Sequence, residues 1–224
     1  MRPVIGLNPW DRFAKEDPMF YIATRRKAQW REEDAFWASG EQTTAFIWDA
    51  VAPHVRGNRL AIELGCGIGR LAVPMSKKFI RLKVVDVSPY MLEKLQQRCQ
   101  QFGVGNMSCH LSTTVWYEEP ADFIYSALML QHLERFDDVE EYIRKIAQCL
   151  SGVAFLQFDT RPRNMFVAAR RAVPDVFLPR TQRRGIRRHR RDPHAIRAIF
   201  RRYGFRIIEE RDPGTALHAF VVTR

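Results

Sequence analysis

The sequence lacks several features that would each point to a particular class of protein. No apolar run reaches the 18 residues that a membrane-spanning helix needs, and the first residues, MRPVIGLNPWDRF, hold no apolar core of a secretion signal. The cysteines are few and far apart, without a CxxC pair, which disfavours a disulfide framework or a zinc site. We therefore expect a soluble cytoplasmic protein with no metal and no membrane partner.

Lysine is missing from the last third of the chain, where the whole positive charge surplus lies. Residues 151–224 hold 17 arginines, no lysine and 6 acidic residues, whereas residues 1–150 are neutral overall. A guanidinium can bind a carboxylate or phosphate through two parallel hydrogen bonds. Recognition of an anionic ligand and the codon bias of a GC-rich genome are equally open explanations. The densest stretch is residues 181–194, TQRRGIRRHRRDPH.

Short apolar runs alternate with amphipathic helices from residue 60 onwards, which is typical of a parallel α/β sheet. Helix starts are expected at Ser88–Pro89, at Asp137 and at Asp192–Pro193. The last two strands are joined by the short link RDPGT and should pair antiparallel. The predicted fold is a doubly wound, Rossmann-like α/β sheet, mostly parallel with the last strand antiparallel. Its seven strands are expected near residues 60–66, 82–87, 107–112, 122–127, 153–158, 205–210 and 216–223.

The length suits a single domain over residues 1–224. Residues 8–50 are rich in aromatic side chains and are predicted to form a helical lid that Gly40 divides. Residues 58–158 form the predicted core, and residues 192–224 a helix and a β-hairpin. Residues 159–191 are longer than a connection needs. We expect an arginine-rich cap there, packed through its apolar residues, which are Met165, Phe166, Val167, Val173, Val176, Phe177 and Leu178.

The stretch AIELGCGIGR places glycines at alternate positions directly after an expected strand. Gly65, Gly67 and Gly69 can adopt a positive φ and carry no Cβ, so a ligand is expected against their backbone. Asp86 ends the next strand 21 residues after Gly65, the spacing of an acid that binds ribose hydroxyls. The GxGxG spacing, with Arg70 after it, departs from the GxGxxG of dinucleotide enzymes.

The combination of ELGCGIGR, VVDVSPYML and DFIYSALMLQHLE resembles the class I S-adenosylmethionine-dependent methyltransferases, especially those that act on small molecules. The resemblance covers residues 58–158 and implies S-adenosyl-L-methionine as the cofactor. It places the glycine loop beside the methionine part of the cofactor. The cofactor-binding residues that it implies are Glu63, Gly65, Cys66, Gly67, Gly69, Asp86, Val87, Met91, Ser112, Thr113, Ser126 and Ala127.

The resemblance also places the methyl acceptor beside the LQHL segment. Gln131 and His132 would face the substrate, and His132 is the candidate general base, although methyl transfer can proceed without one. Further substrate candidates are Tyr21, Trp30, Trp37 and Arg187. We predict an S-adenosylmethionine-dependent methyltransferase that transfers a methyl group to O or N of a small molecule with an acidic group.

Two alternatives stay open. The first is an RNA-binding or RNA-modifying methyltransferase that uses the basic last third. Against it, residues 181–194 lack the interleaved aromatic side chains of a base-stacking surface. The second is a cofactor-binding scaffold without turnover. Binding to a membrane surface is disfavoured, because residues 181–191 hold few apolar side chains.

Overall fold

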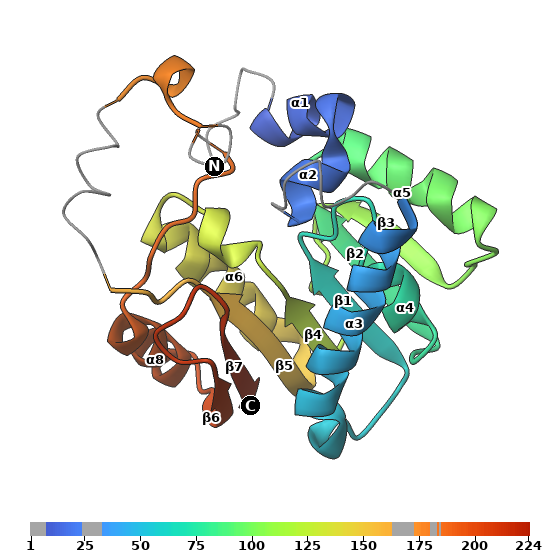
Figure 1. Ribbon diagram of the computed structural model, residues 1–224. Helices are drawn as coiled ribbons and strands as arrows, with labels where there is room; N and C mark the ends of the chain where they lie inside the picture. The colour runs from blue at the N-terminus through green and yellow to red at the C-terminus, as the bar shows by residue number, and fades with distance from the viewer. Residues whose placement is uncertain (1–7, 24–32, 163–172, 180–182, 184) are drawn as a thin grey trace.

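A seven-stranded sheet runs through the computed structural model, which describes residues 8–23, 33–162, 173–179, 183 and 185–224 (Figure 1). The strand order is β3-β2-β1-β4-β5-β7-β6. β7 runs antiparallel to its neighbours β5 and β6, and the pairs from β3 to β5 are parallel, so the predicted fold class is confirmed. The bounds are β1 Leu60–Leu64, β2 Arg81–Asp86, β3 Met107–Leu111, β4 Ala121–Ser126, β5 Leu150–Phe158, β6 Arg206–Arg211 and β7 His218–Thr223.

Helices cover both faces of the sheet. α3 (Glu33–Val51), α4 (Ala72–Ser76) and α5 (Pro89–Gln101) pack on one face, and α6 (Phe136–Cys149) and α8 (Pro193–Arg202) pack on the other. β1 is buried along its whole length, as expected of a parallel strand covered on both sides. No helix within the described ranges is both long and apolar enough to cross a membrane.

The strand order reverses beside β1, because β2 and β3 extend the sheet to one side and β4 and β5 to the other. Ligands of doubly wound sheets bind at the carboxyl ends of the strands at this point. Residues 65–69, which carry the glycine motif, directly follow β1. The fold therefore places the motif where a ligand is expected.

Two short helices, α1 (Pro9–Glu16) and α2 (Pro18–Ala23), lie over the end of the sheet at which α5 begins (Figure 1). Ser88 Oγ, at the N-cap of α5, donates a hydrogen bond of 2.6 Å to Asp11 of α1. The apolar side of α1 buries Phe13, which clusters with Tyr21 of α2 and Met91 of α5. The first helices thus cover the carboxyl edge of the sheet.

Two of the three predicted helix starts are confirmed. Ser88 and Asp192 are N-caps whose side chains accept hydrogen bonds from the first turn, and a proline follows each. α6 begins instead at Phe136 with Arg135 at the N-cap, so the expectation for Asp137 was wrong. Asp137 lies in the first turn and binds Arg135. A carboxylate there still interacts favourably with the positive end of the helix dipole.

Gly40 does not divide the N-terminal helices, contrary to expectation, because α3 continues through it from Glu33 to Val51. A Cβ at Gly40 would lie 2.2 Å from the carbonyl oxygen of Arg70. Arg70 Nη1 in turn donates to Ser39 O at 3.2 Å and to Thr43 Oγ1 at 3.2 Å. Gly40 is therefore a packing residue that lets α3 lie directly against the end of the glycine loop.

The segment before α8 packs only in part as expected. Leu178 and Ile186 are buried, but Val176 and Phe177 of the 3-10 turn η5 (Asp175–Phe177) are 74% and 77% exposed. η5 projects from the body of the molecule (Figure 1). Its apolar side chains therefore have no neighbouring surface against which they could be buried. Three other apolar residues of the expected cap lie outside the described residues, namely Met165, Phe166 and Val167.

We predict that Gly40→Ala lowers the free energy of unfolding by roughly 1–3 kcal/mol, because overpacking against the Arg70 backbone outweighs the better helix propensity of alanine. Gly105→Ala is the matched control, since a Cβ there meets nothing within 4 Å. Urea denaturation measures both. Equal stability of the two variants would contradict the proposed role of Gly40.

Candidate active site

The loop after β1 holds three glycines in the left-handed region, with φ of 77° at Gly65, 53° at Gly67 and 91° at Gly69. A Cβ at Gly65 would lie 2.3 Å from the Met129 side chain, and one at Gly67 would lie 2.6 Å from Ile22 of α2. The left-handed conformation therefore favours glycine at all three positions, and at Gly65 the close approach of Met129 adds to this requirement. The loop is a cradle of bare backbone, bordered by Met129 and Ile22.

Asp86 joins this loop to the start of α5. Its Oδ2 accepts a hydrogen bond of 2.8 Å from Gly67 N, and its Oδ1 accepts one of 3.0 Å from Ser88 N. Burial raises the pKa of Asp86, and these N–H groups oppose the rise. Each carboxylate oxygen has a further lone pair. The side chain can therefore also accept hydrogen bonds from the hydroxyls of a ribose.

Glu63, in β1, is a buried acid beside the loop. The Tyr125 hydroxyl donates a hydrogen bond of 2.7 Å to Glu63 Oε2. Burial raises the pKa of Glu63 to about 8, although the Tyr125 hydrogen bond and the charge of Arg70 act in the opposite direction. A cationic group bound here would favour the carboxylate form. Glu63 is thus suited to the amino group of a ligand.

The predicted adenine side lies next to Asp86. Ser112 N donates a hydrogen bond of 2.8 Å to the Asp86 carbonyl oxygen. This bond brings the end of β3 beside the end of β2. Ser112 is buried and Thr113 is exposed, while Met91 is buried under the lid. Val87 is exposed although it is apolar, which suits a residue that packs against a flat aromatic ring.

Small side chains surround the rest of the loop. Burial raises the pKa of the Cys66 thiol well above its usual range, so Cys66 is a neutral packing residue rather than a nucleophile. Ser126 Oγ donates a hydrogen bond of 3.2 Å to Leu64 O, and this bond links the ends of β4 and β1. Ala127 is half-buried. The predicted sulfonium side thus carries no charged side chain among these three residues.

His132 ends the 3-10 turn η3 (Leu130–His132), on the predicted acceptor side. Its Nδ1 lies 3.3 Å from the Arg187 carbonyl oxygen, which can only accept a hydrogen bond, and the Ile186 backbone also hydrogen-bonds the ring. Burial and the charge of Arg188 lower the pKa of His132 to about 4. The Trp10 ring packs edge-on against the imidazole, with ring centroids 5.5 Å apart.

Gln131 precedes His132 and is completely buried. Neither Oε1 nor Nε2 of its side chain has a hydrogen-bond partner in the part of the chain that the structure describes. Its backbone oxygen accepts a hydrogen bond of 2.7 Å from His189 N. η3 therefore lies between the glycine loop, which Met129 contacts, and residues 185–191.

The aromatic substrate candidates do not all gather at this place. Tyr21 is buried and stacks on Phe13 with centroids 3.9 Å apart. Trp37 contacts Arg98 and Phe102 at the last turn of α5, away from the glycine loop. Trp30 lies outside the described residues. Trp10 is not among the substrate candidates from the sequence, although it lies in the aromatic-rich region 8–50.

The arginine-rich stretch is bound to the protein by its own side chains. Arg183 Nε donates 3.1 Å to Leu178 O, and Arg191 Nη2 donates to Leu133 O. Arg187 is mostly buried and lies 3.8 Å from Asp175. Burial lowers the pKa of Arg188, and the nearby Asp159 opposes this shift. Arg184 lies outside the described residues.

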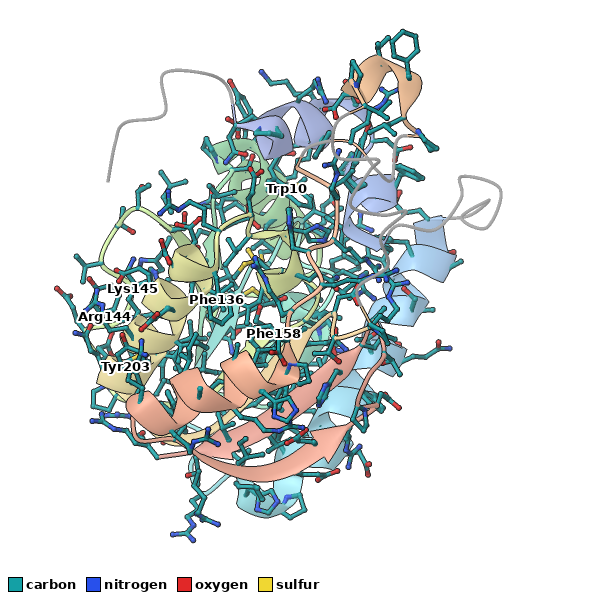
Figure 2. All side chains as sticks on the ribbon, turned by 90° about the vertical axis from the view of Figure 1, so that its left-hand side faces the viewer. Trp10, Phe136, Arg144, Lys145, Phe158 and Tyr203 are labelled. Carbon is teal, nitrogen blue, oxygen red and sulfur yellow. The ribbon has the colours of Figure 1, made fainter. Side chains whose placement is uncertain are left out.

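A separate hollow of about 440 Å³ lies at the far ends of α6 and α8, where Figure 2 labels Arg144 and Tyr203. Arg144 binds Glu141 with two hydrogen bonds, and Arg202 binds Glu140 at 2.6 Å. Both guanidinium groups are thus held by carboxylates, and the hollow is not part of the predicted site. Its lining residues are Arg144, Ala147, Gln148, Arg202, Tyr203, Gly204 and Arg224.

Several site residues had weak or no sequence signals. Asp11 and Ile22 reach the site only because α1 and α2 fold over the sheet edge. Met129 lies in the quoted LMLQHL segment but was not assigned to the loop. Tyr125 had a usable signal, since it is a polar residue within the apolar run of β4. No group of metal-ligating side chains occurs among the described residues.

A glycine loop at the switch point of a doubly wound sheet, with an acid ending the second strand, defines a protein that binds an adenosine-containing cofactor. The methyltransferase domain family Methyltransf_23 matches residues 34–210, and the chain belongs to this family. It is a class I methyltransferase, and its cofactor is S-adenosylmethionine. The glycine cradle and the free lone pairs of Asp86 fit this cofactor.

Solved structures share the fold at low sequence identity. Magnesium protoporphyrin IX methyltransferase from Synechocystis PCC 6803, with bound SAH, has a TM-score of 0.66 at 16% identity, over 96% of this chain and 97% of that one. An S-adenosylmethionine-dependent methyltransferase from Clostridium acetobutylicum has a TM-score of 0.66 at 14% identity, over 96% and 99%. Mitomycin 7-O-methyltransferase has a TM-score of 0.60 at 16% identity, over 96% of this chain and 60% of that one. No curated protein sequence matches the chain.

We predict that the affinity for S-adenosylmethionine falls about tenfold for each pH unit below pH 8. The pKa of Glu63 is raised to about 8 in the free protein, so binding an ammonium group below that pH must first expel the proton. Calorimetric titration at pH 6, 7, 8 and 8.5 measures the slope. Glu63→Gln should bind more weakly and without this slope. An unchanged slope in the variant would show that another group titrates.

Proposed function

We propose that the enzyme transfers the methyl group to an oxygen or nitrogen atom of a small molecule that carries an acidic group. The observation that carries the proposal is the roof over the carboxyl edge of the sheet. α1 is fixed to α5 by the Asp11–Ser88 hydrogen bond, and residues 185–191 are fixed to η3 by the His189–Gln131 hydrogen bond. An enclosed site of this kind suits a small molecule better than a polymer.

The cofactor supplies an activated methyl group on a positively charged sulfur, so the main task of the chain is to position the acceptor and exclude water. Trp10 and the apolar cluster around Phe13, Tyr21 and Met91 cover the site with apolar side chains. The imidazole of His132 is the base that would accept a proton from an acceptor O–H or N–H. A base is needed only where the acceptor atom is protonated.

The low pKa of His132 supports an acidic group on the acceptor. The charge of Arg188 is one of the causes that lower this pKa to about 4. An anionic group bound near Arg188 would offset that charge and raise the pKa of His132 toward its ordinary value. The acceptor would then improve the base that deprotonates it.

The alternative of an RNA-directed protein has no support from the similar structures, two of which are named for small-molecule acceptors. Many described arginines of the last third also have intramolecular partners. Arg161 binds Asp159, Arg197 binds Glu210, and Arg211 binds Glu209 and Asp49. A surface that neutralises phosphates needs guanidinium groups directed to solvent.

We predict that Asp86→Asn weakens binding of S-adenosylmethionine by at least about tenfold, because charge-assisted hydrogen bonds to the ribose are lost. Glu119→Gln is the control, because Glu119 is an acid bound to Arg81 and Lys83 at the amino end of β2. Calorimetry measures both affinities. Incubation with methyl-labelled cofactor and separate metabolite and RNA fractions then identifies the acceptor class. Label in RNA alone would contradict a small-molecule acceptor.

We predict that His132→Asn lowers the rate of methyl transfer by roughly 10²–10⁴-fold, the usual contribution of a general base, while cofactor affinity is unchanged. The asparagine amide can still donate to the Arg187 carbonyl, so the local fold is kept. Single-turnover rates with labelled cofactor measure the effect. A rate within about threefold of the native enzyme would mean that His132 only orients residues 185–191.

A further inference from the structure

The side-chain amide of Gln131 is a buried polar group whose hydrogen bonds are missing from the described structure. It is completely buried, and both Oε1 and Nε2 lack a partner among the described residues. Buried polar side chains are nearly always hydrogen-bonded, and an exception calls for a water, a ligand or a functional role. Gln131 is therefore a polar group that a bound molecule can satisfy.

Another buried glutamine shows that the fold can satisfy such a group. Gln157, near the end of β5, is almost completely buried, and its Nε2 donates 3.1 Å to the Leu217 carbonyl. Gln157 is thus tied into the sheet, whereas Gln131 is not. The two buried amides thus differ in their hydrogen bonding, and this difference points to a role of Gln131 other than packing.

The neighbours of Gln131 place it at the acceptor side of the proposed site. His132 is the next residue, and Met129 lies against Gly65 of the cofactor loop. On the other side, the Gln131 backbone binds His189 of the roof. η3 also packs against β5, which leads into the buried Asp159. The cofactor loop, residues 185–191 and β5 therefore all lie next to η3, which carries Gln131.

We propose that Gln131 determines acceptor specificity by binding an edge that presents a hydrogen-bond donor beside an acceptor, as a carboxamide, a lactam or a hydroxyl next to a carbonyl does. Such an edge satisfies Oε1 and Nε2 together. A carboxylate would satisfy Nε2 alone and set its charge against Oε1. The acidic group of the acceptor therefore binds elsewhere, near Arg188. This inference rests on the proposed methyl-transfer function.

The first test is the stability of the free protein. Gln131→Met removes an unsatisfied buried amide at nearly constant volume, so Tm should rise by about 2–6 °C. Gln157→Met breaks a hydrogen bond that is made, so its Tm should fall. Differential scanning calorimetry without cofactor measures both. A fall in Tm for Gln131→Met would show that the amide is satisfied structurally and would overturn the proposal.

The second test uses two neutral probes of nearly equal shape, 4-hydroxybenzamide and 4-hydroxyacetophenone, in the presence of S-adenosylhomocysteine. Only the first has a donor beside its carbonyl. The native protein should bind it at least about tenfold more tightly, and Gln131→Met should lose this preference while Gln157→Met keeps it. No preference in the native protein, no binding of either probe, or a preference kept by Gln131→Met would overturn the proposal. The incubation with methyl-labelled cofactor and separate metabolite and RNA fractions reports failure of the proposed function instead.

Discussion

The structure of the site depends on the buried carboxylate of Asp86. By accepting hydrogen bonds from Gly67 N and Ser88 N, it joins the loop after β1 to the first turn of α5. Ser88 then binds Asp11 and brings α1 over the same edge. One side chain thus fixes three segments that are far apart in the sequence. An acid at this position therefore has a structural role in the fold, in addition to the ribose-binding role proposed for it.

The roof is a consequence of the same arrangement. With α1 held in place, Phe13 and Pro9 lie against Gly185, whose φ is 88° and whose missing Cβ leaves room for them. The chain after Gly185 then runs past His132 and Gln131 to Asp159 at the end of β5. The two parts proposed to enclose the acceptor side therefore pack against each other at Gly185.

Features with a local physical cause could be predicted from the sequence. β1 followed by alternate glycines is such a feature, as is Ser88 before Pro89, because the backbone conformations that these residues require are set within a few positions. Gly40 could not be predicted, since its reason is the Arg70 carbonyl 30 residues further along the chain. Tyr125 stands out in the sequence as a polar residue within an apolar strand, but its partner Glu63 could not be predicted, because the two residues meet only when β4 pairs with β1.

The abundance of arginine also has a structural explanation in part. The described residues 178, 179, 183 and 185–191 contain little regular structure, so backbone carbonyls there and in nearby turns need donors other than a helix or a sheet. A guanidinium has five N–H donors. Arg183 binds the carbonyl of Leu178, Arg190 that of Pro162 and Arg191 that of Leu133. A lysine ammonium on its flexible stem could not donate to these carbonyls with the fixed geometry of a planar guanidinium. The charge of Arg188 has a different effect, because it contributes to the low pKa of His132.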